Sequence, residues 1–123
     1  MKFELDEAAA ERQISGYQAG WIRVGELRIE RPCLIHSEGI AEAQVPASPG
    51  ALEIRHFMPV LEINPEILLL GTGERQVFAD YVITQHLAQN GIALEIMDTG
   101  AACRLYNVLA NEGRSVAAML YMI

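Results

Sequence analysis

Residues 98–107, which read DTGAACRLYN, carry the side chains best suited to chemistry in this sequence. Cys103 and Arg104 stand in the first turns of an expected helix, and Asn107 follows about one turn later. A cysteine near a helix start and beside an arginine can have a lowered pKa, and its thiolate would be a nucleophile. No histidine lies nearby in sequence to act as its base, although His36, His56 or His86 could approach in space. A small, buried and unreactive Cys103 is commoner than a reactive one, and we predict the unreactive form.

A second candidate is the turn formed by Gly71, Thr72 and Gly73, which directly follows an apolar strand. Two glycines allow backbone N–H groups to turn inward and bind an anion. A dinucleotide-binding loop needs a third glycine, however, and a P-loop needs a lysine. Glu74 follows here instead and would repel phosphate. We therefore predict a tight connecting turn and no nucleotide cofactor.

Cys33 and His36 are the one pair with a spacing that suggests metal binding. They lie on an expected strand, where positions three apart point to opposite faces. A structural metal site also needs a second pair of ligands, and none follows in the sequence. We predict an ordinary strand and no metal cofactor.

The elements that position these residues alternate between strands and helices in the second half of the chain. Apolar strands are expected at 66–70, 92–97 and 115–122, and helices at 80–90 and from Asp98 or Thr99 to about 112. Strands separated by helices of this length pair in parallel through crossovers. The first half predicts a hairpin at 21–29, further strands at 33–36 and 40–45, and a short helix within 52–62. The fold class is therefore α/β, with an antiparallel β region in front.

The helix expected after Asp98 has an apolar and a polar face. Its buried stripe is predicted to contain Ala101, Leu105, Val108 and Leu109, and its polar stripe Arg104, Asn107 and Asn111. The last strand, 116–123, is apolar without alternation, which indicates a strand covered on both faces.

Composition limits the class of protein. The 123 residues are 51% hydrophobic and 20% charged, which is typical of a globular domain, and the net charge of −7 disfavours nucleic acid and anionic membrane surfaces. Two cysteines seventy residues apart make no disulfide framework. The acidic start resembles neither a secretory signal nor a transit peptide, and no apolar run is long enough to span a membrane. We expect an acidic arm at 1–16, a single domain at 17–123 and a cytoplasmic protein.

Ligands of open α/β sheets bind beyond the carboxyl ends of the parallel strands. Both candidate loops leave strands at that edge, so the sequence predicts one candidate ligand or interaction edge there. Its members are Gly71, Thr72, Gly73, Asp98, Thr99, Cys103, Arg104 and Asn107.

The segments PEILLLGTGERQVF (65–78) and GIALEIMDTGAACRLYNVLANEGRSVAAML (91–120) resemble a small family of uncharacterised domains found in bacteria, archaea and mitochondria. Its members include the mitochondrial NADH:ubiquinone oxidoreductase complex assembly factor 3 and an adipogenesis-associated protein. The stretch WIRVGELRI (21–29) fits more weakly, and Ala79 stands where the family usually has proline. The resemblance implies a three-layer fold around a central mixed, mostly parallel sheet.

Two functions remain open from the sequence. The resemblance and the lack of a paired nucleophile and base favour a non-enzymatic interaction or assembly factor with protein partners, for a respiratory or membrane complex. Without a transit peptide, this chain would be a bacterial counterpart of the mitochondrial factor. The alternative is a small-ligand binder or enzyme that uses the strand-end edge. A pocket lined by Arg104 and Asn107 would favour the ligand, whereas an internally paired Arg104 would favour interaction.

Overall fold

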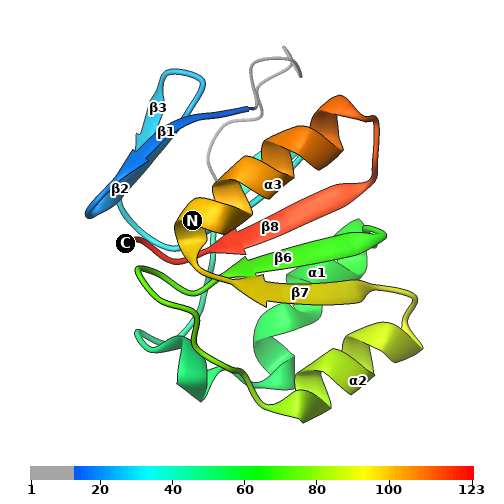
Figure 1. Ribbon diagram of the computed structural model, residues 1–123. Helices are drawn as coiled ribbons and strands as arrows, with labels where there is room; N and C mark the ends of the chain where they lie inside the picture. Colours follow the sequence, from blue (N-terminus) through cyan, green and yellow to red (C-terminus); the bar gives the residue numbers. More distant parts are fainter. Residues whose placement is uncertain (1–12) are drawn as a thin grey trace.

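The computed structural model describes residues 13–123 (Figure 1). Residues 1–12 of the acidic arm expected at 1–16 lie outside that range. The elements follow one another as β1 (Ile14–Gln18), β2 (Trp21–Val24), β3 (Leu27–Ile29), β4 (Cys33–His36), β5 (Gly39–Glu42), η2 (Pro49–Ala51), η3 (Ile54–Phe57), α1 (Met58–Ile63), β6 (Ile67–Gly71), α2 (Tyr81–Gln89), β7 (Ala93–Met97), α3 (Thr99–Asn111) and β8 (Val116–Leu120).

The antiparallel β region is a separate small sheet with the strand order β1-β2-β3. The expected hairpin is confirmed: Ile22 pairs with Ile29, and Gly25 makes the turn with a φ of 59°. Both isoleucines are buried, so one face of this sheet belongs to the core. Strand β1 begins at Ile14, within the range that the sequence assigned to the acidic arm.

The central sheet has five strands in the order β5-β4-β8-β6-β7. Strands β8, β6 and β7 are mutually parallel, whereas β4 runs antiparallel to both β5 and β8. Figure 1 shows α3 and the small sheet over one face of this sheet, and α1 and α2 over the other. The prediction of a three-layer α/β domain around a mixed sheet is confirmed.

Strands β6 and β8 are continuously apolar because each faces a core on both sides. Leu120 of β8 belongs to the cluster beneath α3, while its neighbour Met119 belongs to the cluster beneath α1 and α2. Leu69 and Leu68 of β6 divide in the same way. Successive side chains of a strand point to opposite faces, so a strand covered on both faces needs apolar residues at every position.

Two elements differ from the prediction. The expected helix within 52–62 is divided into the 3-10 turn η3 and the short helix α1, and Pro59 is tolerated because it lies in the first turn of α1. Strand β7 is at the edge of the sheet and is only half-buried, although its apolar run had indicated a buried strand. Its position follows from strand order, which the sequence pattern does not encode.

Candidate functional site

The turn after β6 is closed by the side chain of Thr72. The Thr72 hydroxyl donates to the carbonyl oxygen of Arg75 at 2.6 Å and accepts the N–H of Val77 at 3.0 Å. Its own backbone N–H donates to the carbonyl oxygen of Met97, the last residue of β7. The buried Thr72 therefore stabilises a local turn, and its hydroxyl is used within the chain.

Thr99 joins the two candidate loops to the last strand. Its fully buried hydroxyl donates to the carbonyl oxygen of Tyr121 at 2.7 Å and accepts the N–H of Gly73 at 2.8 Å. The Thr99 N–H donates in turn to the carbonyl oxygen of Gly73 at 2.9 Å. The Gly73 N–H, which an anion-binding turn would direct at its ligand, thus binds a protein hydroxyl instead.

Gly71 is required by the close approach of α3 to the sheet. A Cβ atom there would lie 2.9 Å from both Leu120 Cδ2 and Thr99 Oγ1, and 3.0 Å from Thr99 Cα. Distances this short are not tolerated without movement of the backbone. The glycine therefore allows the start of α3 to pack directly on β6, and that contact is the reason for a small residue here.

Asp98 caps α3, as the sequence predicted. Its backbone is extended, and its carboxylate accepts the N–H of Ala101 at 2.9 Å. A carboxylate at this position also complements the positive end of the helix dipole. The role of Asp98 in this structure is to begin the helix.

Replacing Asp98 by alanine is expected to lower the free energy of unfolding by about 0.5–2 kcal/mol, because the cap bond and the dipole interaction are both lost. Urea unfolding followed by circular dichroism measures this change. Asp98→Asn is the matched control, since asparagine keeps the acceptor and should retain most of the stability. An alanine variant as stable as the parent would contradict the capping role.

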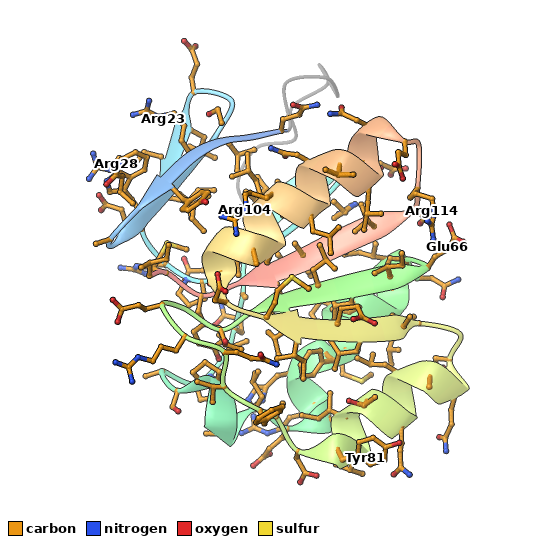
Figure 2. The ribbon with its side chains drawn as sticks, viewed as in Figure 1. Arg23, Arg28, Glu66, Tyr81, Arg104 and Arg114 are labelled. Carbon is orange, nitrogen blue, oxygen red and sulfur yellow. The ribbon has the colours of Figure 1, made fainter. Side chains whose placement is uncertain are left out.

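The polar stripe of α3 faces the small sheet. The Arg104 guanidinium donates from Nη1 to the hydroxyl of Tyr17 on β1. Figure 2 shows Arg104 on the side of α3 that is turned toward this sheet. The Tyr17 ring lies over Gly100, where a Cβ atom would be 3.1 Å from Tyr17 Cε1. Arg104 is therefore paired within the chain.

Asn107 binds strand β1 through both ends of its amide. Its Oδ1 accepts the N–H of Ile14 at 2.9 Å, and its Nδ2 donates to the carbonyl oxygen of Ile14 at 2.8 Å. One turn later, Asn111 accepts a hydrogen bond from the Gln13 side chain. Three polar residues of α3 thus hold the N-terminal strand in place.

The buried face of α3 differs from the predicted stripe. Its fully buried apolar side chains are Ala102, Cys103 and Tyr106, whereas Val108 is 52% exposed. The prediction was right in part, because Leu105 and Leu109 are half-buried and pack against the core cluster. Helix α3 contacts β1 as well as β6 and β8, and Tyr106 belongs to the core cluster that these elements share, while Val108 faces outward.

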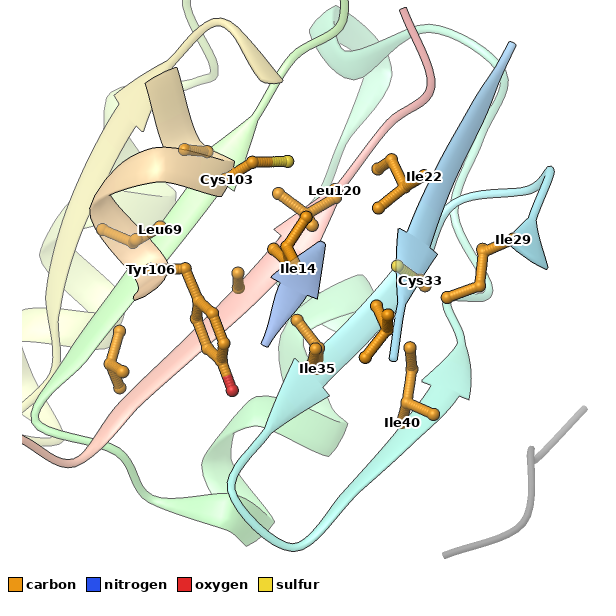
Figure 3. Packing of buried hydrophobic residues seen from close by; sticks show 14 residues of the cluster. Ile14, Ile22, Ile29, Cys33, Ile35, Ile40, Leu69, Cys103, Tyr106 and Leu120 are labelled. Atoms are coloured by element: carbon orange, nitrogen blue, oxygen red, sulfur yellow. The ribbon is translucent and has the colours of Figure 1, made fainter. Parts of the chain in front are cut away.

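Cys103 is 1% exposed in the cluster shown in Figure 3, which also contains Cys33. Burial raises the pKa of the Cys103 thiol from its ordinary 9.0 to about 12; the Arg104 guanidinium opposes this rise and the Asp98 carboxylate adds to it. Burial, aided by Cys103, likewise raises the pKa of Cys33 to about 12. The arginine neighbour therefore does not produce a thiolate at neutral pH.

The histidines lie away from Cys103. His56 is on η3 and His86 is on α2, and both elements cover the face of the sheet opposite α3 (Figure 1). His36 is on β4 and lines a hollow with Pro59 of α1, which places it on that same opposite face. The side chains that a cysteine nucleophile would use as a base are thus separated from Cys103 by the central sheet.

Thiol labelling of the native protein at pH 7 is expected to be slow at Cys103, because the thiol is buried and protonated. Labelling in denaturant should proceed at the rate of an ordinary thiol, and peptide mapping separates Cys103 from Cys33. The raised pKa also lowers stability at high pH: between about 9.0 and about 12 the unfolded thiol releases its proton while the buried one keeps it. Native labelling faster than that of a free thiol would show a reactive cysteine.

The side chains of Cys33 and His36 lie on opposite faces of the central sheet, so they cannot bind the same metal ion. Cys33 packs in the core beneath α3, while His36 lies at the opposite face and its Nδ1 accepts the N–H of Glu38. Within residues 13–123, no three histidine, cysteine or acidic side chains are grouped so that they could hold a metal ion.

The surface formed by residues 13–123 includes three hollows. One of about 420 Å³ lies between β4 and α1, one of about 520 Å³ between α3 and β7, and one of about 200 Å³ beside η3. None of these three has Arg104 or Asn107 in its wall. In the described part of the chain, no helix is long and apolar enough to cross a membrane.

Two tyrosines that bind residues of the candidate edge were not predicted from the sequence. The Tyr17 hydroxyl and the Tyr121 carbonyl oxygen each accept a hydrogen bond from α3, yet neither tyrosine belongs to a recognisable motif. The Tyr121 hydroxyl also donates to the carbonyl oxygen of Pro46 at 2.9 Å. A lone tyrosine in an apolar strand gives no signal of the distant polar atom that it binds.

Comparison with known proteins identifies relatives over most of the chain. It is 30% identical over 115 residues to human NADH dehydrogenase [ubiquinone] 1 alpha subcomplex assembly factor 3, which covers 93% of this chain and 62% of that protein. It is also 38% identical over 65 residues to a protein of Francisella tularensis named 13 kDa major membrane protein, covering 53% of each. The chain spans about half to two thirds of the length of the curated relatives it matches first.

Solved structures agree in fold. A crystal structure of a Bordetella parapertussis protein has a TM-score of 0.84 and 32% identity, covering 90% of this chain and 95% of that one. A solution structure from Bordetella pertussis, described as an Mth938-like domain, has a TM-score of 0.80 and 29% identity, covering 98% and 92%. The family described as protein of unknown function (DUF498/DUF598) matches residues 14–121, and the chain belongs to that family.

Proposed function

We propose that this chain is a non-enzymatic interaction factor, cytoplasmic in location, that holds protein partners during assembly of a respiratory or membrane protein complex. The observation that carries the proposal is the internal pairing of the α3 polar face. Arg104 is bound to Tyr17, and Asn107 is bound to both backbone groups of Ile14. A ligand site at this edge would need these groups to be directed at the ligand.

The exposed surface supports contact with proteins. Four large apolar side chains lie close together in sequence between β6 and the first turn of α2, and each is substantially exposed: Val77 (37%), Phe78 (80%), Tyr81 (68%) and Val82 (44%). Exposed apolar side chains that gather in one region are typical of protein interaction sites. Tyrosine and phenylalanine are also enriched in the centres of such interfaces.

The names of the relatives support the same class of function. The human relative and the one from Danio rerio, at 30% and 31% identity, are both named as assembly factors of an NADH dehydrogenase subcomplex. The alternative, a ligand site around residues 71–73 and 98–107, would require the Gly73 N–H and the Arg104 guanidinium to leave their present partners.

The test is made in cells that lack this chain. Membranes from the deletion strain are expected to contain less assembled NADH:ubiquinone oxidoreductase on native gels, and the wild-type chain should restore it. A Phe78→Ser, Tyr81→Ser double variant should restore less and recover less partner in affinity capture. Val108→Ser is the matched control, because Val108 is also an exposed apolar residue but lies on α3.

Two results would overturn the proposal. The first is unchanged assembly of the complex together with capture of no partner. The second is a strong thermal shift by a small metabolite that disappears in Arg104→Ala and Asn107→Ala, which would favour the ligand site. Since Phe78 and Tyr81 are exposed, their replacement should leave the unfolding transition of the purified protein nearly unchanged.

A further inference from the structure

The outer face of the small sheet carries a cluster of one tryptophan and two arginines. Strands β2 and β3 pair so that Arg23 lies directly opposite Arg28. Trp21 lies two residues before Arg23, and alternate residues of a strand share a face. The guanidinium carbons of Arg23 and Arg28 lie 5.2 and 4.9 Å from the centre of the Trp21 ring. We call these three residues the Trp–Arg face.

The arrangement holds two like charges close together. Like charges directly opposite each other on neighbouring strands destabilise a sheet. Contact of each guanidinium with the Trp21 ring offsets part of that cost, because the face of an aromatic ring attracts cations. The ring itself does not neutralise either charge. The Trp–Arg face thus gathers two arginines over one ring and keeps its positive charge.

In the part of the chain that the structure describes, carboxylates neutralise this face only in part. Glu30 accepts a hydrogen bond from Arg28 Nε at 3.0 Å, in an exposed ion pair. Within residues 13–123, no carboxylate lies within ion-pair distance of Arg23. Figure 2 shows Arg23 and Arg28 at the outer side of the small sheet, away from α3. In a chain with a net charge of −7, this is a local positive surface.

We propose that the Trp–Arg face binds an acidic segment of a partner protein. Guanidinium groups bind carboxylates through paired hydrogen bonds, and a tryptophan surface binds apolar or aromatic side chains beside them. The chemistry fits a short peptide with aspartate or glutamate next to a larger apolar residue. This inference rests on the proposed function, because it assigns a surface to one class of protein partner.

The size of the positive surface favours a short acidic peptide over nucleic acid. Two arginines suit one or two carboxylates. A nucleic acid extends its charge far beyond such a surface and would meet the acidic remainder of the chain, which repels it. A peptide can place its few carboxylates on the cluster alone. Charges more than about 8 Å away are largely screened at physiological salt.

Trp21 is the single tryptophan of the chain, so its fluorescence reports binding at this face directly. The probe is a short synthetic peptide of glutamate and serine with one leucine, and the control peptide has glutamine in place of each glutamate. The acidic peptide is expected to change Trp21 fluorescence in a saturable manner at low salt and to bind more weakly as salt is added. The glutamine peptide should bind at least about tenfold more weakly.

Variants locate the site. Arg23→Glu, Arg28→Glu should weaken binding of the acidic peptide by about tenfold or more, because attraction becomes repulsion. Arg114→Glu is the matched control: it changes an arginine on the far side of the molecule, as Figure 2 shows, and should leave affinity within about twofold. Both variants alter exposed residues, and circular dichroism verifies that each is folded.

The proposal is overturned if both peptides bind alike, if neither changes Trp21 fluorescence, or if the Arg23, Arg28 variant binds as the wild type does. Tighter binding of a single-stranded oligonucleotide than of the acidic peptide would also overturn it. Affinity capture separates this inference from the proposed function. A partner recovered equally by wild type and by the Arg23, Arg28 variant leaves the proposed function standing and refutes this one. If the wild-type chain captures no partner, the proposed function is contradicted. The peptide titration then still tests whether the Trp–Arg face binds an acidic segment.

Discussion

Replacing Thr99 by valine is expected to destabilise the fold by about 2–6 kcal/mol. Valine has nearly the shape of threonine but lacks the hydroxyl, so the Gly73 N–H and the Tyr121 carbonyl oxygen would both lose a partner. Each buried polar group left without a hydrogen bond costs about 1–3 kcal/mol. Thr99 is fully buried, so water cannot readily replace the lost hydroxyl.

Thr99→Ser is the matched control for this prediction. Serine keeps the hydroxyl and loses one methyl group, whose burial is worth only about 1 kcal/mol. Urea unfolding of the three proteins gives the two differences in free energy. A loss for valine no larger than the loss for serine would contradict the prediction, because the two hydrogen bonds would then contribute no more to stability than one methyl group.

Removing Leu120 to Ile123 is expected to abolish the cooperative unfolding transition and soluble expression. Leu120 is fully buried in the central strand β8, and loss of a buried leucine side chain alone costs about 2–5 kcal/mol. The deletion also removes the backbone bond from the Tyr121 N–H to the Gly71 carbonyl oxygen, and the acceptor of Thr99. Domains are stable by only about 5–15 kcal/mol in total.

A shorter truncation is the control for this result. Removing only Met122 and Ile123, which are half-buried, keeps β8 and the Tyr121 hydrogen bonds to Gly71 and Thr99, so this protein should still fold cooperatively. It loses the bond from the Gly20 N–H to the Ile123 carbonyl oxygen. If the longer truncation also unfolded cooperatively at a similar urea concentration, β8 would be dispensable, in conflict with its position between β4 and β6.

Local signals in the sequence predicted local structure well. The aspartate of DTG marked the start of α3, the apolar run at 66–70 marked β6 as a strand, and the run at 116–123 marked β8 as a strand covered on both faces. Both signals act over a few residues: a cap bonds to the next turn, and burial on two faces requires apolar residues at consecutive positions. The α/β class followed from the alternation of such segments.

Features that depend on distant contacts were not predictable in this way. The buried face of α3 was misjudged in part, because β1, more than eighty residues away, covers a second side of the helix. Thr99 was considered as a helix start and as a member of the candidate edge, whereas in the structure its hydroxyl bridges Gly73 and Tyr121. Strand β7 was expected to be buried because an apolar run does not reveal whether a strand lies inside the sheet or at its edge.

The bond between Asn107 and Ile14 has a consequence for self-association. An unpaired strand edge can recruit a strand from another copy of the chain, which is a common route to aggregation. On β1, the Asn107 amide occupies both backbone groups of Ile14, and an irregularity in the register between Ile14 and Gly16 disturbs the adjoining positions. Such irregularities are a known protection of sheet edges. Helix α3 therefore blocks intermolecular pairing at this edge by imitating a neighbouring strand.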